Sequence, residues 1–132
     1  MSSFLLEIVT PERKVYAEDV NMVIVKGSEG EMGILPNHIP MVTPLKIAPV
    51  TIKLKNAEEK IAVNGGFLEI RKDKVVILAE SAERQADIDL ARAEAAKQRA
   101  EQLMSGRKDD YDQVRAELAL QRALNRIAVK QG

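Results

Sequence analysis

The chain has 132 residues, of which 45% are hydrophobic and 30% charged, so its composition is that of a folded protein with a core rather than a disordered one. Twenty basic residues balance twenty acidic ones, and only 3% of residues are aromatic. These values argue against a protein that binds nucleic acid or an anionic membrane through bulk charge or base stacking.

The residue types also limit the chemistry. Cysteine is absent, which excludes disulfides and thiolate catalysis, and a single histidine, His38, argues against a histidine-rich metal site. The N-terminus lacks the basic region of a signal peptide, and its apolar run ends at Leu6. No apolar stretch approaches the roughly 20 residues that span a bilayer. We therefore expect no metal site and no direct membrane insertion.

The first half of the chain predicts short strands separated by turns. The predicted strands cover residues 3–10, 15–16, 21–26, 50–55, 60–63, 67–71 and 74–80. Glycines at 27, 30 and 33 predict a tight turn, and residues 71–74 predict a hairpin turn. Asn64-Gly65-Gly66 is compatible with a hairpin turn or with a glycine bulge inside one longer strand. Strands at this spacing are typical of a small antiparallel sandwich or flattened barrel of roughly 80 residues.

Residues 33–50 combine four prolines with many apolar side chains. Proline lacks an amide donor and restrains the residue before it, so we expect no helix and no central strand here. Edge strands and extended loop are the prediction. The apolar side chains, among them Ile34, Leu35, Ile39 and Met41, are compatible with an exposed protein interface or with a packed loop that covers the sheet.

From Asp87 onward alanine is frequent and proline is absent, which predicts two helices. We expect Asp87 to cap the first helix, with Asp89 in its first turn, and Ser105-Gly106 to end it. Asp109 or Asp110 would cap the second helix. The short loop predicts an antiparallel hairpin. Apolar residues repeat at helical spacing in two series: Ala93, Ala96, Ala100 and Leu103, then Ala116, Leu120, Ala123 and Ile127.

The alanine content of these series bears on how firmly the hairpin packs. A seam of alanines buries little apolar area, and burial stabilises by only about 25 cal/mol per Å². We therefore expect the hairpin to dock marginally on the strand domain and to be able to leave it. A short hairpin that stays in place is the alternative.

Within the predicted helices, three arginines have no carboxylate three or four positions away: Arg99, Arg122 and Arg126. An antiparallel hairpin centred near position 107 would place Arg92 opposite Arg122, with Asp89 beside Arg126. Two guanidinium groups about 6 Å apart repel by roughly 3 kcal/mol at an effective dielectric of about 20. A bound anion would relieve this repulsion, and a polyphosphate suits arginine geometry. An acidic patch on a partner protein and solvated, diverging arginines are the alternatives.

Catalytic motifs are missing from the sequence. It contains no phosphate-binding P-loop, no Gly-x-Ser-x-Gly elbow and no His-Glu-x-x-His. His38 lies between Pro36 and Pro40 without a recognisable catalytic partner. We therefore expect a protein that is not an enzyme.

Four segments, GEMGILPNHIPMVTPL, NGGFLEI, VVILAESAER and DIDLARAEAA, resemble the epsilon subunit of bacterial F-type ATP synthases. The resemblance covers nearly the whole chain in order and is closest to the subunits of Bacillus-like bacteria, thermophiles among them. It implies an α+β fold, with an antiparallel β-sandwich at 1–84 followed by a mobile regulatory two-helix hairpin at 85–132. It also favours the glycine bulge over the hairpin turn at Gly65-Gly66.

The resemblance further implies a non-catalytic central-stalk subunit of the proton-translocating enzyme, peripheral on the cytoplasmic face of the bacterial plasma membrane. The sandwich would bind the gamma subunit and the membrane rotor ring of c subunits. The residues carried over to that interface are Glu29, Glu31, Ile34, His38 and Met41. The helices would fold onto the sandwich or extend among the catalytic alpha and beta subunits and block ATP hydrolysis. The residues expected to contact those subunits are Arg115, Arg122, Arg126 and Lys130.

The family resemblance finally implies ATP as a regulatory ligand of the folded hairpin, with the role of magnesium left open. The family motif is complete here as Ile88, Asp89, Arg92 and Ala93, and the accompanying residues are Glu83, Arg99, Arg122 and Arg126. A free-standing nucleotide sensor would need these arginines but not the apolar proline loop. A helical adaptor would need a longer leucine seam.

Overall fold

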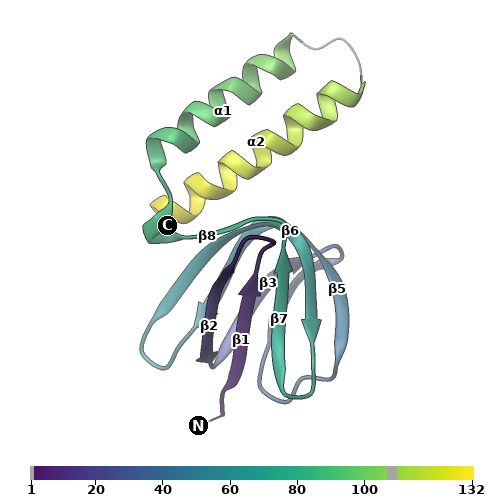
Figure 1. Ribbon diagram of the computed structural model, residues 1–132, viewed down its shortest axis with the longest axis vertical. Helices are drawn as coiled ribbons and strands as arrows, with labels where there is room; N and C mark the ends of the chain where they lie inside the picture. The colour runs from purple at the N-terminus through teal and green to yellow at the C-terminus, as the bar shows by residue number, and fades with distance from the viewer. Residues whose placement is uncertain (1, 107–109) are drawn as a thin grey trace.

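The computed structural model describes residues 2–106 and 110–132, without the side chains of Asp110 and Tyr111. A layered sheet is followed by two antiparallel helices, with α2 lying between α1 and the sheet (Figure 1). This α+β fold confirms the prediction. The elements are β1 (Phe4–Val9), β2 (Lys14–Val20), β3 (Met22–Gly27), β4 (Gly30–Ile34), β5 (Met41–Lys53), β6 (Glu58–Ile70), β7 (Lys74–Ala79), β8 (Ala82–Arg84), a 3-10 turn η1 (Gln85–Asp87), α1 (Leu90–Ser105) and α2 (Asp110–Gln131).

The strands form one hydrogen-bonded sheet in the order β2-β1-β7-β6-β5-β3-β4, with β8 also on β6. Neighbours are antiparallel except β1 and β7, which run parallel although about 70 residues separate them. The sheet folds over, so that the end strands β2 and β4 contribute to one core. Its fully buried side chains include Leu6, Ile8, Val20, Val23, Ile34, Ile52, Ile61, Leu68 and Ile77.

Strand β5 corrects the prediction for the proline-rich segment. It contains Pro44 and Pro49 yet lies inside the sheet, between β6 and β3. The two prolines fit because β5 pairs with β3 only intermittently: Thr51–Lys53 pair with β3, Leu45 pairs with Gly27, and the register shifts between them. Pro49 lies in the interrupted part of the ladder to β3, and Pro44 lies just beyond its last pair. The missing amide donors therefore fall outside the paired positions. Likewise, Gly33 lies in strand β4 rather than in the predicted turn.

Strand β6 answers the question of the double glycine. It is a single strand of 13 residues that passes through Asn64-Gly65-Gly66, so the hairpin turn is wrong. The pairing with β5 keeps one register on both sides, from Leu45 opposite Gly66 to Ile47 opposite Asn64, so no extra residue is inserted and the predicted bulge is wrong too. Both glycines have positive φ, 85° and 132°, and bend the strand instead.

The short strand β8 continues the line of β7 along β6 and leads to the helices. Arg84 of β8 forms a bidentate ion pair with Glu59 of β6, at 2.7 and 2.9 Å. Its guanidinium also lies 5.1 Å from the ring centre of Tyr16 in β2. Arg84 thus joins three strands and fixes the chain where it leaves the sheet.

Helix α1 begins two positions later than predicted. Asp89 is its N-cap, and the carboxylate accepts a hydrogen bond from the Arg92 amide at 3.1 Å. Asp87, predicted as the cap, lies in η1. The helix ends at Ser105 with Gly106 as its C-cap, as predicted. The prediction that Asp109 or Asp110 caps α2 falls outside the described residues.

The two helices meet through alanines. Ala93 and Ala100 of α1 and Ala116 and Ala123 of α2 are buried, which confirms the predicted seam, while Leu103 is exposed. Helix α2 rests on β5, β6 and η1. Among the described residues, no helix is long and apolar enough to cross a membrane.

Candidate functional site

A cavity of about 370 Å³ opens where the helical hairpin meets the sheet, a volume within the range of small-molecule sites. Four elements build its wall: the β7–β8 connection, η1 with the start of α1, the outer face of α1, and α2. The lining residues are Ser81, Glu83, Asp87, Asp89, Arg92, Ala93, Ala96, Arg99 and Arg126. Six of the eight residues predicted to bind ATP are therefore brought together: Glu83, Asp89, Arg92, Ala93, Arg99 and Arg126.

The basic wall comes from helical periodicity. Arg92 and Arg99 are seven positions apart on α1, which places them on one face two turns apart. Both side chains are exposed, and no carboxylate of the described residues lies within ion-pair distance of either guanidinium. Arg126 reaches the cavity from α2 and donates a hydrogen bond from Nε to Glu83. Two arginines are thus available to a ligand, while the third also ties α2 to β8.

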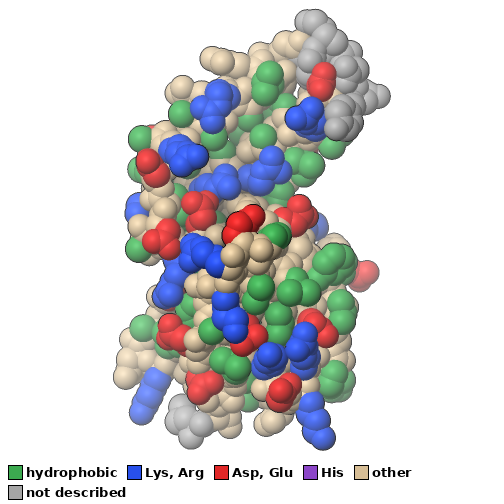
Figure 2. Space-filling view, in the orientation of Figure 1, with side chains coloured by type: hydrophobic (Ala, Val, Ile, Leu, Met, Phe, Trp, Pro, Cys, Tyr) green, Lys and Arg blue, Asp and Glu red, His purple; other side chains and the backbone are tan. Residues whose placement is uncertain are grey.

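The acidic wall is larger than predicted. Glu83, Asp87 and Asp89 all line the cavity, so three carboxylates face three arginines. Glu83 is engaged by Arg126, and Asp89 is engaged by the α1 backbone. Figure 2 shows Lys and Arg side chains across the hairpin and Asp and Glu side chains along its boundary with the sheet. This arrangement suits a ligand with an anionic part and a hydrogen-bond-donating part.

Ile88 is part of the predicted motif but does not line the cavity. Its side chain is 3% exposed and packs with Ala62 of β6 and Val129 of α2. Beside it, the Gln85 amide donates to the carbonyl oxygens of Val129 and Lys130, at 3.0 and 3.3 Å. Ile88 therefore holds the last turns of α2 against the sheet.

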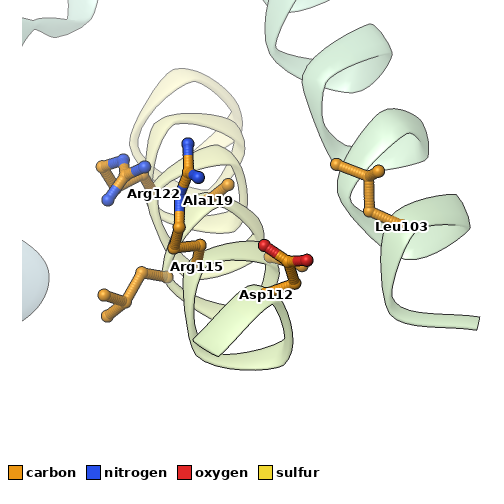
Figure 3. A pocket seen from close by; sticks show the side chains of 7 residues that line it. Leu103, Asp112, Arg115, Ala119 and Arg122 are labelled. Carbon is orange, nitrogen blue, oxygen red and sulfur yellow. The ribbon is translucent and has the colours of Figure 1, made fainter. Parts of the chain in front are cut away.

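Arg122 is the second predicted residue that the cavity does not include. It lies one turn before Arg126 and lines two other hollows, one against the sheet beside Lys46 and Glu80. The other hollow, of about 510 Å³, lies between the helices, with Arg115, Ala119 and Arg122 on α2 and Leu103 on α1 (Figure 3). The predicted pairing of the hairpin placed Arg122, rather than Arg126, opposite Arg92. The helices cross in a register that brings Arg126 there instead.

Sequence reasoning missed Ser81 and Asp87 as lining residues. Asp87 was assigned to the helix cap, which Asp89 takes. Ser81 carried no signal, because its position depends on the bend between β7 and β8 rather than on a motif.

The residues predicted to contact the stalk and rotor fall at different places. Glu29 lies in the β3–β4 turn and Glu31 in β4, where Glu31 faces a hollow beneath α2. His38 lies in the 35–40 loop, next to the 71–74 turn, and its Nδ1 donates to the Ile39 carbonyl oxygen at 2.9 Å. The structure does not gather these side chains into one cluster.

The apolar members of that set differ in exposure. Ile34 is completely buried in the core, and Met41 packs against the core. Ile34 therefore offers no surface to a partner, because strand alternation turns it inward. The exposed apolar side chains are its neighbours Leu35 and Ile39, the latter 77% exposed.

Further apolar residues, exposed or half-buried, lie across the outer face of the sheet. Pro44, Phe67, Leu78 and Val9 lie opposite one another on β5, β6, β7 and β1, and Phe67 is 51% exposed. These four side chains form an apolar row across the sheet, and exposed apolar side chains of this kind occur at protein interfaces.

Comparison with known proteins assigns both parts of the chain. The model of the ATP synthase delta/epsilon chain beta-sandwich domain matches residues 3–85, and that of the long alpha-helix domain matches residues 86–131. The chain belongs to the ATP synthase delta/epsilon chain family. The beta-sandwich expected at the N-terminus is thereby confirmed.

Relatives of this family from Bacillus-like bacteria are similar over most of the chain. The ATP synthase epsilon chain of Alkalihalophilus pseudofirmus is 55% identical over 130 residues and 98% of each chain. That of Bacillus cereus is 54% identical over 129 residues, 98% of this chain and 97% of the relative. That of Brevibacillus brevis is 57% identical over 106 residues and 80% of each. The resemblance to bacterial epsilon subunits is confirmed.

Solved ATP synthases contain chains of the same fold. A chain of the Euglena gracilis mitochondrial enzyme matches with a TM-score of 0.81 and 21% identity over 97% of this chain and 81% of its own. A chain of the Tetrahymena thermophila central stalk and c-ring matches with a TM-score of 0.59 and 16% identity over 98% and 95%. At these identities the likeness concerns the fold.

Proposed function

We propose that this epsilon-family chain is a non-catalytic subunit of the central stalk of an F-type ATP synthase, and that ATP binds its folded hairpin as a regulatory ligand. Family membership supports the first part. The observation that carries the second is the cavity, where Arg92 and Arg99 extend along one helix face without carboxylate partners among the described residues. A triphosphate would neutralise them, and the carboxylates opposite would accept from the amino or hydroxyl groups of a nucleoside.

The sandwich supplies the attachment to the stalk. The exposed apolar side chains of Leu35, Ile39 and Phe67 are available to the gamma subunit and the c-ring, with His38 as a polar contact beside Leu35. Glu29 and Glu31 would make separate polar contacts from the β3–β4 turn and β4. In this assembly the protein is peripheral, on the cytoplasmic face of the bacterial plasma membrane. Its partners are gamma, the c-ring and, when the hairpin extends, alpha and beta.

The same cations would serve both positions of the hairpin. In the folded position Arg126 is held by Glu83, and the Lys130 ammonium donates to the Gln85 carbonyl oxygen at 3.0 Å. Extension of the helices would release both, and together with Arg115 and Arg122 they would face an acidic loop of beta. ATP would stabilise only the state that it binds and so would shift the population toward the folded, non-inhibiting position.

Calorimetric titration of the full chain with ATP, with and without magnesium, tests the ligand. The double variant Arg92→Ala, Arg99→Ala is the informative one, because neither side chain holds an ion pair with the described residues, unlike Arg126. We expect saturable binding by the native protein, at least about tenfold weaker binding by the variant, and no loss of thermal stability without ATP.

The control is Arg71→Ala, which removes an arginine at the opposite end of the sheet, paired with Glu69 at 3.0 Å. Equal binding by the native protein and the double variant would show that the cavity is not the nucleotide site.

A further inference from the structure

A series of hydrogen-bonded polar side chains links α2, where it packs on β6, to the wall of the cavity. The Asn125 side-chain amide donates to the Val63 carbonyl oxygen and to Asn64 Oδ1, each at 3.1 Å. The Asn64 side-chain amide in turn donates to Ser81 Oγ at 2.9 Å. Ser81 lines the cavity and is joined to Asn64 a second time, because the Asn64 backbone amide donates to the Ser81 carbonyl oxygen at 2.9 Å.

Burial gives these contacts weight. Asn64 is 3% exposed and Asn125 5% exposed. A buried amide that loses its hydrogen-bond partner cannot replace it with water. Removing any one of the three side chains therefore weakens the hydrogen bonds of the others. Both amide hydrogens of Asn125 are engaged with β6, and Asn125 Oδ1 has no partner among the described residues. The side chain therefore has one favourable orientation, with its donors toward the sheet.

The hydrogen bonds run in one direction. Asn125 donates to Asn64, and Asn64 donates to Ser81, so the Ser81 oxygen is an acceptor in this chain. Rotation of the Asn64 amide would bring two NH₂ groups face to face and is unfavourable. The Ser81 hydroxyl therefore keeps its hydrogen for another acceptor, and no described residue takes it. An acceptor atom of a ligand in the cavity could take the hydrogen bond that the Ser81 hydroxyl has left to donate.

We infer that Asn64 is a positioning residue that couples nucleotide binding in the cavity to the docking of α2, through Ser81 on one side and Asn125 on the other. The inference rests on the proposed function and adds the route of regulation. An acceptor of the nucleotide that takes the Ser81 hydrogen favours the orientation of Asn64 in which Oδ1 faces α2. Docked α2 in turn holds the Ser81 hydroxyl ready for the ligand, as reciprocal linkage requires.

A double-mutant cycle on ATP affinity tests this route in the full chain. Ser81→Ala and Asn125→Leu are made singly and together, first with Asn64 present and then in the Asn64→Leu background. We expect each single variant to bind ATP about tenfold more weakly and the pair to lose less than the product, because Ser81 and Asn125 act through one residue. In the Asn64→Leu background the two effects should multiply independently.

Three further variants and measurements make the result interpretable. Ser81→Thr keeps the hydroxyl and should retain most of the affinity. Gln113→Leu removes another side-chain amide that links the helices, donating to Met104 at 3.0 Å far from the cavity, and should leave ATP affinity unchanged. Amide exchange in residues 118–131 should be faster in Asn125→Leu than in the native protein, and ATP should slow it less.

The outcomes separate the two proposals. Native binding of ATP with unchanged affinity in Ser81→Ala, or with independent effects of Ser81→Ala and Asn125→Leu when Asn64 is present, would overturn the coupling and leave the nucleotide site standing. Failure of the native protein to bind ATP would overturn both.

Discussion

Gly66 occupies a point where two strands approach too closely for a side chain. A Cβ atom there would lie 2.1 Å from the Leu78 carbonyl oxygen and 2.9 Å from the Ala79 Cα, both part of the backbone of β7. Its φ of 132° adds strain for any other residue. We expect Gly66→Ala to destabilise the protein by about 3 kcal/mol or more, because strand β7 itself must move. Chemical unfolding measures the loss.

Gly30→Ala is the matched control for that substitution. Gly30 has nearly the same φ, 130°, but a Cβ atom there would meet nothing within 4 Å. It should cost only the backbone strain, about 1–2 kcal/mol. If both variants lost the same free energy of unfolding, the backbone conformation of Gly66, and not its close approach to β7, would explain why glycine is required there.

Tyr16 carries a hydroxyl that the core does not need. Its oxygen is buried and has no partner among the described residues. Burial, with the Glu18 and Glu59 carboxylates, raises the pKa of Tyr16 to about 12. We expect Tyr16→Phe to be neutral or stabilising by up to about 1 kcal/mol at pH 7, because no hydrogen bond is lost.

The same residue predicts a response to alkali. Because the pKa of Tyr16 is higher in the folded protein than the ordinary value of 10.0, the neutral form is favoured in the folded state. Its contribution is fully present below pH about 10 and is lost as the pH rises toward about 12. Urea unfolding across this pH range should therefore show that the free energy of unfolding falls more steeply with pH for the native protein than for Tyr16→Phe. Parallel curves would contradict the assignment.

At this scale the sequence revealed the charged residues of the cavity better than the buried ones. The motif and the partnerless arginines identified Arg92, Arg99 and Arg126 because charge is visible without knowledge of packing. Asn64 and Asn125 could not be found, since an asparagine before two glycines is typical of a turn. The partner of Arg126, Glu83, lies 43 positions away and depends on how α2 rests on β8.

Among the elements, the helical hairpin depends on small side chains. Ala123 of α2 is completely buried, so a larger side chain there must displace its neighbours. We expect Ala123→Leu to separate the helices at a cost of about 1–3 kcal/mol and to widen the cavity, since Ala93 and Arg126 lie nearby on the same seam. Amide exchange in α1 should become faster while β6 is unchanged.

The control is Ala95→Leu, on the exposed face of α1. It should leave exchange in both helices unchanged, because the added side chain remains in solvent. An Ala123→Leu variant that exchanges as slowly as this control would show that the seam accommodates larger residues.

Strand β5 explains why the elements were predicted unevenly. Alternating and β-branched runs were enough to locate β1, β3 and β7, and the alanine periodicity was enough for both helices. The rule that excludes proline from central strands failed because it concerns particular amide groups, not strands as a whole. Whether Pro44 and Pro49 face a gap in the ladder depends on the register of β3, which the local sequence does not contain.

In the molecule as a whole, α2 is attached to the sheet more firmly than α1 is. Helix α2 rests on the sheet through Asn125 and Arg126 and on η1 through Lys130, whereas α1 is held mainly by α2. We expect amide exchange to be fastest in α1, intermediate in α2 and slowest in β6, and ATP to slow both helices without affecting the strands. Helices that exchange as slowly as β6 without ATP would contradict a hairpin that can leave the sheet.

The parallel pairing of β1 with β7 has a consequence for biosynthesis. Strand β1 is made first, but its second neighbour is complete only when residue 79 has left the ribosome, which at about 5–20 residues per second is several seconds later. Until then one edge of the β1–β2 hairpin remains unpaired. The sandwich closes late, and the helices are translated after it. The helices leave the ribosome only after every strand of the sheet, so the strands can pair without them, and detachment of the helical hairpin would leave the ladder of the sheet intact.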